Sequence, residues 1–398
     1  MRILYHHRTM GRGAEGIHIA SIVKAFDQLG HRVTVISPPG VDPLREVGQS
    51  PLDKSEATVR GVNLLWKMIS MCAPQVFFEV LEILYNFYGI WKIQELVKRN
   101  EFDLLYERNA YFLFAAAYIS RRYGIPLAVE ANEIVGIKRA RRLKLKKPAI
   151  WIENYTLRSA QSIFVVSSFL QGRVKEIVKD RVAVCVTPNA IDPSVCEKAT
   201  KREEIRHRLD ISQKTVIGFA GWFDWWDRLD LLLNEQKQLK KIGYANVATL
   251  LIGDGPMMKE LKERAKELQI EDSVIFVGPI KRKDVIDYID AFDIGILPHS
   301  NEFGSPVVLF EMMALGKPLV VPSLPPINDV ITHNFNGLIF EPLNEQDMLE
   351  KIMMLIEQPD LRKELGDNGK NFAKRKHTWV GNAEMILETL RKNGLNSQ

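Results

Sequence analysis

The stretch that decides the fold is "PHSNEFGSPVVLFEMMALGKPLVVP", residues 298–322. It opens in a loop, continues as an apolar run that contains a single acid, Glu311, and turns at Gly-Lys-Pro into a second apolar run. Ser305 followed by Pro306 predicts a helix with serine as its N-cap and proline at its first position. The free amides and positive dipole end of such a helix suit a phosphate group.

Glu311 falls near the second turn of this predicted helix. A carboxylate there can accept two hydrogen bonds, which is what holding a ribose diol requires. The alternative is that Glu311 is an ordinary surface residue of the helix, and the spacing by itself does not separate the two interpretations.

Short apolar strands alternate with helical patterns along the whole chain, which predicts α/β domains with parallel sheets. We expect two doubly wound, Rossmann-like domains facing across a cleft, because the series restarts after a charged segment near 198–210. The predicted division is 1–190, 191–372 and a C-terminal helix over 373–398 that crosses back to the first domain. In such sheets ligands bind beyond the carboxyl ends of the strands.

The composition is that of a folded globular protein, with 46% apolar and 26% charged residues in a chain of 398. Three cysteines without a C-x-x-C spacing, and an N-terminus that moves directly into a strand, predict a cytoplasmic protein. The most apolar long segment, 62–91, is interrupted by charged residues and proline, so no membrane span is expected.

Charge is distributed unevenly along the chain. Residues 1–190 carry a net charge of +10, and residues 191–398 carry −5. Seven basic residues fall between Lys138 and Lys147. One interpretation is a solvated helix face. The other is that these residues, together with 62–91, form a surface that binds peripherally to the inner face of an anionic membrane. No aromatic interleaving or reader motif indicates nucleic acid.

The region after residue 303 resembles the signature of the retaining GT-B glycosyltransferases, family 4 in particular. The elements that carry the resemblance are Gly304, Ser305, Pro306, Leu309, Phe310, Glu311, Met313, Ala314, Gly316, Lys317, Pro318, Asn336 and Gly337. The segments "GHRVTVIS", "VTPNAID" and 250–280 extend the resemblance over almost the whole chain, and 106–132 resembles a bacterial branch that acts on cell-surface glycans.

The resemblance implies a transferase that moves a sugar from a nucleotide-sugar, most often UDP- or GDP-linked, to a glycan or lipid-linked acceptor. It implies no metal and no separate cofactor. Glu311 is then expected to bind the nucleotide ribose. The backbone positions expected near the donor are Gly221, Gly304, Ser305, Val307 and Val308.

The sequence departs from the family pattern where the leaving diphosphate is normally neutralised. Trp222 and Asp227 stand where an arginine and a lysine are expected, and Val308 replaces another lysine. Arg228 is the nearest basic residue and is the candidate substitute, with Arg12 or helix amides as alternatives. The first acid of the family's Glu-x7-Glu pair is expected at 303, but Glu302 lies one position earlier.

In the first domain, a glycine-rich segment with Gly11, Gly13 and Gly16 permits close approach of a ligand to the backbone. It meets a dinucleotide-binding fingerprint only loosely, because the expected acid after the second strand is absent. Glu130 and Asn132 end a predicted strand and are the polar candidates near the reacting sugar. His18 contacts a phosphate or the acceptor, or is simply packed.

The histidines His6 and His7 are adjacent in a strand, so they are expected to point to opposite faces rather than at one metal. The predicted catalytic residues are therefore Glu130, Asn132, Arg228 and Glu302. Two other functions stay open at this point: a degenerate homologue that binds a nucleotide-sugar or a partner transferase without catalysis, and an epimerase of the same fold. The "DWWD" sequence at 224–227 is the one segment to test for a metal.

Overall fold

The computed structural model describes residues 1–9, 13–46, 74–137, 143–197 and 199–395. The chain divides into two compact units, residues 1–187 with 382–398, and residues 188–381. The sequence placed the divisions after residues 190 and 372. The second lies later because helix α16 (Pro359–Lys376) continues past residue 372 and packs on α13 (Val307–Ala314).

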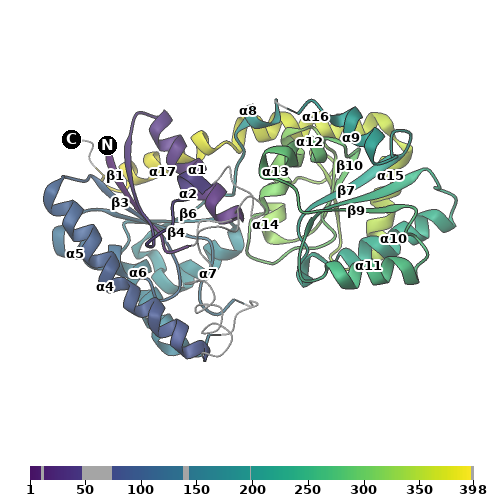
Figure 1. The fold of residues 1–398 in the computed structure, drawn as a ribbon. Coiled ribbons are helices and arrows are strands. Elements are labelled where there is room, and N and C mark those ends of the chain that lie inside the picture. Colours follow the sequence, from purple (N-terminus) through teal and green to yellow (C-terminus); the bar gives the residue numbers. More distant parts are fainter. Residues whose placement is uncertain (10–12, 47–73, 138–142, 198, 396–398) are drawn as a thin grey trace. The chain divides into compact units, whose positions relative to one another are not determined.

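The first unit is built on a six-stranded parallel sheet in the order β2-β1-β3-β4-β5-β6 (Figure 1). Three of its strands are buried on both faces, as expected for a parallel sheet covered by helices. The strands are β1 (Arg2–His6), β2 (Arg32–Ile36), β3 (Leu104–Arg108), β4 (Leu127–Ala131), β5 (Ser162–Val165) and β6 (Ala183–Val186).

Helices cover both faces of this sheet. Because crossovers between parallel strands are right-handed, α4, α5, α6 and α7 share one face, whereas α1 lies on the other and the short α2 packs against it (Figure 1). The helices are α1 (Gly13–Gln28), α2 (Pro43–Glu46), α4 (Gln75–Arg99), α5 (Ala115–Tyr123), α6 (Lys146–Ser159), α7 (Ser168–Val178) and the 3-10 turn η2 (Lys179–Arg181).

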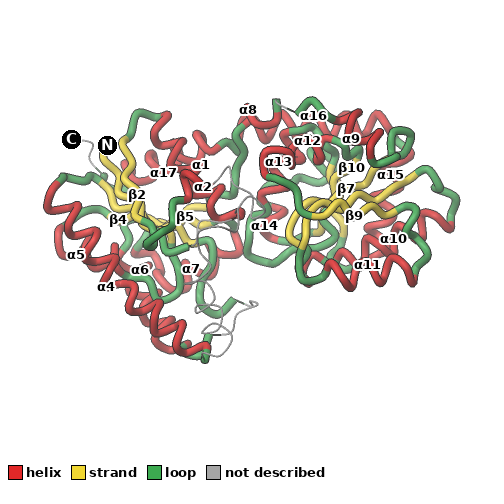
Figure 2. The backbone as a smooth tube through the Cα atoms, in the orientation of Figure 1, coloured by secondary structure: helices red, strands yellow, loops and turns green. Residues whose placement is uncertain are grey.

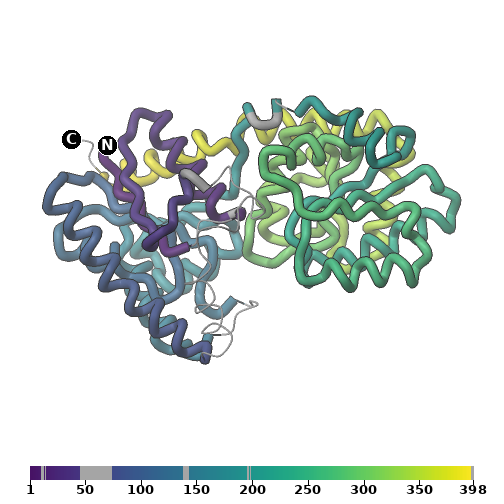
Figure 3. The backbone as a smooth tube through the Cα atoms, viewed as in Figure 1, coloured from purple at the N-terminus to yellow at the C-terminus, as the bar shows by residue number. Residues whose placement is uncertain are grey.

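The glycine-rich segment differs from the prediction of a loop. Gly13 and Gly16 lie in the first turn of α1, with Glu15 there favouring the positive end of the helix dipole. Gly11 and Arg12 lie outside the described residues. Residues 382–395 return to this unit, where the Asn393 carbonyl accepts from Gln161 Nε2 at 2.7 Å and α17 (Trp379–Lys392) runs back over the first unit as a yellow tube (Figure 3).

Helices α4, α5 and α6 form a continuous layer. The carboxylate of Glu79, buried in α4, accepts from the amides of Lys144 and Leu145 and so caps the start of α6. Gly89 allows α4 to approach α5 closely, since a Cβ at this position would lie 2.9 Å from the Cβ of Ala115. All of residues 62–73, and residues 138–142 of the basic run 138–147, lie outside the described residues.

The second unit repeats the architecture with a parallel sheet in the order β12-β11-β10-β7-β8-β9. Figure 2 shows its strands covered by helices on both faces, and the prediction of two doubly wound α/β domains is confirmed. The strands are β7 (Thr215–Trp222), β8 (Val247–Asp254), β9 (Val274–Gly278), β10 (Ile294–Ile296), β11 (Leu319–Pro322) and β12 (Leu338–Phe340).

The reversal in strand order after β9 places α12 and α13 on one face and α10 and α11 on the other (Figure 1). The remaining elements of this unit surround these two layers. They are α8 (Pro193–Cys196), α9 (Arg202–Arg208), η3 (Trp225–Asp227), α10 (Leu229–Lys241), α11 (Met258–Glu267), η4 (Arg282–Asp284), α12 (Val285–Asp290), α14 (Pro325–Asn328), α15 (Glu345–Glu357) and the first residues of α17 (Trp379–Lys392).

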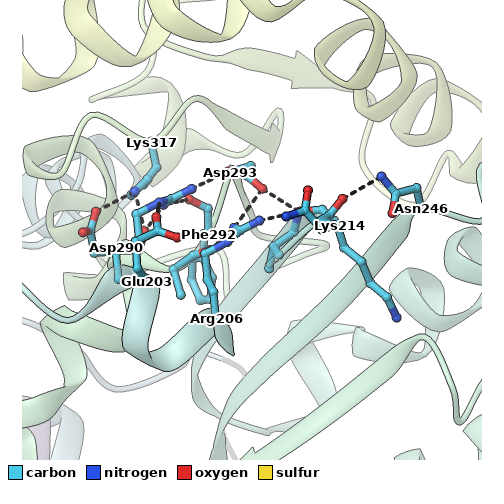
Figure 4. Close-up of polar contacts among 12 residues, drawn as sticks. Glu203, Arg206, Lys214, Asn246, Asp290, Phe292, Asp293 and Lys317 are labelled. Atoms are coloured by element: carbon cyan, nitrogen blue, oxygen red, sulfur yellow. Dashed lines mark hydrogen bonds and ion pairs between the residues drawn. The ribbon is translucent and has the colours of Figure 1, made fainter. Parts of the chain in front are cut away.

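The charged segment that was expected to separate the two series fixes the start of the second unit. Arg206 Nη1 lies 3.0 Å from Asp293 Oδ2, which also accepts from the Val216 amide at 2.8 Å (Figure 4). Lys317, from the Gly-Lys-Pro turn, donates to the Asp290 carbonyl at 2.7 Å and so places a cation at the C-terminal end of α12. This cluster joins α9, β7 and the signature turn.

Candidate active site

The second-unit candidates lie in loops that follow the strands of one parallel sheet, and so they gather at its carboxyl edge. These loops are joined to one another. The Trp226 carbonyl, after β7, lies 3.1 Å from His299 Nδ1, after β10. The strands that lead into the loops also approach closely: at the paired positions of β7 and β8, a Cβ on Gly253 would lie 1.9 Å from the Gly221 carbonyl oxygen. The edge is therefore a connected surface rather than a set of independent loops.

Helix α13 begins one residue later than predicted, at Val307 rather than at Pro306. Pro306 is its N-cap, with an extended ψ of 120°, and Ser305 is not the cap. The Ser305 hydroxyl instead accepts from the Asn189 amide at 3.0 Å, so a contact from a segment 116 residues away replaces the local capping bond. The amides of Val307 and Val308 lie in the first turn, where an α-helix supplies no acceptor of its own.

The loop before α13 is organised by Asn301. Its Oδ1 accepts from the amides of Phe303 and Gly304, at 3.2 and 2.5 Å. The Gly304 amide is therefore already bonded within the loop, whereas the amides of Val307 and Val308 have no acceptor within α13. Glu302 lies on the exposed side of the same loop.

Glu311 is 2% exposed and is not a surface residue of α13. Its carboxylate forms an ion pair with Arg282, which begins the 3-10 turn after β9 and is 30% exposed. Arg282 is not among the residues predicted from the sequence. The available signal was a basic pair, Lys281 and Arg282, directly after a strand of the second series. A buried carboxylate paired with a partly exposed guanidinium forms a polar site at the sheet edge.

The loop after β7 carries the departures from the family pattern. Trp222 is 64% exposed, and the carboxylate of Asp227 accepts from the Asp224 amide at 3.0 Å in a capping box. Burial raises the pKa of Asp227 to about 7. Arg228 has a left-handed backbone, with φ of 48°, and a bidentate contact with Asp230 at 2.8 and 2.9 Å. Its guanidinium therefore already has a carboxylate partner.

The "DWWD" segment uses both its acids for local structure. Asp224 accepts from the Trp225 amide at 2.8 Å, and Asp227 closes the reciprocal half of the capping box. In the parts of the chain that the structure describes, no group of three His, Cys, Asp or Glu side chains is placed to hold a metal ion.

In the first unit, Glu130 is the centre of a buried network at the end of β4. Its carboxylate contacts Arg108, His18 Nε2 at 3.0 Å and the Tyr106 hydroxyl at 3.0 Å. Asn132 Nδ2 donates to the same carboxylate at 2.7 Å. Burial alone raises the pKa of Glu130, but the charges of His18 and Arg108 outweigh burial and lower it to about 2. The ionised carboxylate of Glu130 therefore fixes the side chains around it, and His18 is one of the residues of this buried network.

The two adjacent histidines point to different partners. His6 Nδ1 lies 2.7 Å from Glu107 Oε2, whereas His7 Nε2 lies 2.8 Å from the Ser37 hydroxyl. Burial, followed by the charge of His6, lowers the pKa of His7 to about 3. His7 is therefore a neutral, buried residue at physiological pH.

Comparison with known proteins assigns both units. A family model described as Glycosyltransferase Family 4 matches residues 15–195, and one described as Glycosyl transferases group 1 matches residues 201–372. Among curated proteins, the alpha-monoglucosyldiacylglycerol synthase of Streptococcus pneumoniae is 25% identical, over 78% of this chain and 73% of that protein. The N-acetyl-alpha-D-glucosaminyl L-malate synthase of Bacillus anthracis is 23% identical, over 75% and 79%.

Solved structures share the fold over nearly the whole chain. The Anabaena protein HepE, in complex with UDP, has a TM-score of 0.70 with 18% identity, covering 98% of this chain and 100% of that one. The sucrose-phosphate synthase of Thermosynechococcus elongatus has a TM-score of 0.73 with 15% identity, covering 98% and 99%.

The two family models and the fold together show that the chain is a glycosyltransferase of GT-B fold. Its first unit carries the Family 4 domain and its second unit the group 1 domain. The predicted resemblance to GT-B glycosyltransferases of family 4 is thereby confirmed. No helix in the described part of the chain is long and apolar enough to cross a membrane.

Proposed function

We propose that this glycosyltransferase moves a sugar from a nucleotide-sugar, UDP- or GDP-linked, to its acceptor with retention at the anomeric carbon. One observation carries the proposal: Glu311 is a buried acid at the carboxyl edge of the second sheet, one turn behind the free amides of Val307 and Val308. Its carboxylate suits the ribose diol, and the amides suit the phosphates. The related HepE structure contains UDP, which supports this choice of ligand.

The leaving diphosphate needs positive charge, and the residues at 222 and 227 do not supply it. Two guanidiniums stand at the same sheet edge, Arg228 and Arg282, with side chains 35% and 30% exposed. Each is paired with a carboxylate, Asp230 or Glu311. We propose that they turn from these acids toward the diphosphate when the donor binds, and Glu311 then accepts the ribose hydroxyls in place of Arg282.

The acceptor belongs to a glycan or a lipid-linked sugar in cell-surface polysaccharide or glycolipid synthesis. The similarity to a diacylglycerol-modifying synthase supports a lipid-linked acceptor, as does the net charge of +10 on residues 1–190. A cytoplasmic protein with peripheral contact to an anionic membrane is consistent with both. In the first unit, Glu130 and Asn132 act by orienting His18 and Arg108 rather than by contacting the sugar.

Calorimetry against UDP, GDP, ADP and CMP tests the nucleotide site. We expect one of these nucleotides to bind, and Glu311→Gln to weaken it about tenfold to a hundredfold, the value of a hydrogen bond to a charged group. Glu271→Gln, an exposed acid between α11 and β9, is the matched control and is expected to leave binding unchanged. If none of the four binds, the role assigned to Glu311 is refuted.

Release of free nucleotide from the matching sugar donor, with membrane extract as acceptor, tests the reaction. Removing either guanidinium, by Arg228→Gln or Arg282→Gln, is expected to slow release about a hundredfold, as for other positioned charges at a developing anion. Binding without release would favour the degenerate homologue, which the pairing of Arg228 with Asp230 makes the second candidate. A product still joined to its nucleotide would identify an epimerase.

A further inference from the structure

Helix α4 carries an apolar stripe that faces away from the first unit. Its members recur at alternating intervals of three and four residues, which places them on one side of the helix. They are between 40% and 71% exposed, whereas Glu79, Asn86, Gly89 and Ile93 form the buried side. The stripe consists of Phe77, Val80, Leu84, Phe87 and Trp91. An exposed stripe about 21 Å long marks a surface for interaction rather than a solvated helix.

Apolar exposure continues onto the neighbouring helices. Tyr118 in α5 is 39% exposed, and Ile150 and Trp151 in α6 are 39% and 71% exposed. Because α4 packs on α5 and α5 packs on α6 in one layer, the exposed apolar side chains belong to a broad face and not to one helix (Figure 1). We call the outer surface of these three helices the α4–α6 face.

The charges of the α4–α6 face favour an anionic partner. Each acid of the three helices is already engaged: the buried Glu79 with the amides at the start of α6, Glu82 with Arg8, Glu95 with Lys92 and Arg99, and the buried Glu153 with the Val135 amide. The basic residues of the three helices outnumber them. Lys92 and Arg99 share Glu95, and the other basic residues are Lys98, Arg121, Arg122, Lys146, Lys147 and Arg158. A second copy of the chain docking by the same face would bring like charges together.

A pocket of about 400 Å³ opens between α5, α6 and the turn at 179–181. Three arginines line it, and its remaining lining residues are Trp151, Asn154, Tyr155 and Ser159, with no acid among them. The guanidinium of Arg121 lies 5.4 Å from the Tyr155 ring centre, and Trp151 stacks on that ring. Arg158 is held by the Ile177 carbonyl, to which it donates twice at 3.2 Å. A fork of guanidiniums in an aromatic wall matches a phosphate group.

We propose that the α4–α6 face docks on an anionic lipid surface and that the pocket of Arg121, Arg158 and Arg181 receives the phosphate of a lipid headgroup. The aromatic residues of the α4 stripe then lie at the boundary between headgroups and acyl chains, as in interfacial helices. This proposal rests on the proposed function, because it places the unit expected to bind the acceptor where a lipid-linked acceptor is found.

Co-sedimentation of the full chain with vesicles tests the proposal. We expect binding to vesicles of phosphatidylglycerol and phosphatidylcholine in equal parts, and little binding to phosphatidylcholine alone. Arg121→Gln with Arg181→Gln removes two basic contacts, which at about fivefold each weakens binding about twenty-five-fold. Phe87→Ser with Trp91→Ser is expected to weaken it at least as much. Lys259→Gln with Lys262→Gln, two exposed charges of α11, is the control.

The other outcomes separate the alternatives. If the double arginine variant sediments like the wild type while glycerol phosphate binds the wild type in calorimetry, the pocket takes a soluble phosphate and the proposal is overturned. A dimer seen by light scattering, lost in the Phe87→Ser/Trp91→Ser variant and accompanied by no vesicle binding, overturns it as well. Nucleotide binding is measured on each variant: vesicle binding that fails while nucleotide binding persists refutes this inference alone and leaves the proposed function standing.

Discussion

Replacing Glu130 by glutamine tests whether a single buried carboxylate holds the first unit together at its sheet edge. Glu130 and Arg108 have side chains only 3% and 9% exposed, so the substitution leaves a buried guanidinium without its counter-charge. Breaking a buried pair in this way costs about 3–5 kcal/mol. Glutamine keeps the shape of the side chain, so the loss reports charge rather than packing.

The pH dependence of stability gives a second value for the contribution of the Glu130 carboxylate to the free energy of unfolding. The pKa of Glu130 is lowered to about 2 in the folded protein, below the ordinary value of 4.5. The unfolded chain therefore binds the proton more readily, and this contribution of roughly 3 kcal/mol is present above about pH 5 and is lost as the pH falls toward 2. At about pH 3 roughly 2 kcal/mol of this contribution is already lost. The difference in the free energy of unfolding between wild type and Glu130→Gln is therefore expected to be smaller by that amount.

Hydrogen exchange measured by mass spectrometry on peptides from β3 and β4 reads the first unit without interference from the second. The control is Glu101→Gln, which removes an ion pair whose acid is 92% exposed and is expected to change the free energy of unfolding by less than about 1 kcal/mol. Protection in Glu130→Gln equal to that of the control, or a difference from wild type that does not shrink in acid, would refute the reasoning.

Three further changes probe the second unit through its melting temperature. Burial raises the pKa of Asp227 to about 7, so the folded state binds the proton more tightly than the unfolded chain does. The melting temperature is therefore expected to fall as the pH rises from about 4 to 7, and Asp227→Asn is expected to abolish this dependence. Lys317→Met removes the cation from the end of α12 and is expected to cost about 1–3 kcal/mol, against no change for the exposed Lys241→Met. Gly253→Ala places a Cβ 1.9 Å from a carbonyl oxygen and is expected to cost about 3 kcal/mol or more. Gly243→Ala, with a similar positive φ but open space, is expected to cost about 1 kcal/mol.

The fold could be predicted from the sequence because its signals are local. The alternation of short apolar strands with helical patterns can be recognised from residues only a few positions apart. The strands that begin at 104 and 247 lie where this pattern predicts them. The partners of the site residues were not predictable in this way. Ser305 satisfies the local rule for an N-cap, yet its hydroxyl bonds to Asn189, which only the folded unit brings near.

Arg282 shows why the proposed donor site could not be predicted completely from the signature stretch. Glu311 was found from the signature stretch, but its partner lies 29 residues earlier, in the crossover that leads from β9 back to β10 across the sheet. That crossover delivers a guanidinium to α13 although the motif itself lacks the usual basic residues. The departures at Trp222 and Asp227 are therefore accompanied by two guanidiniums at the same sheet edge, Arg228 and Arg282, each paired with an acid. Displacement of these acids by a diphosphate is the proposed step that separates an active transferase from a degenerate homologue, and the nucleotide-release assay tests it.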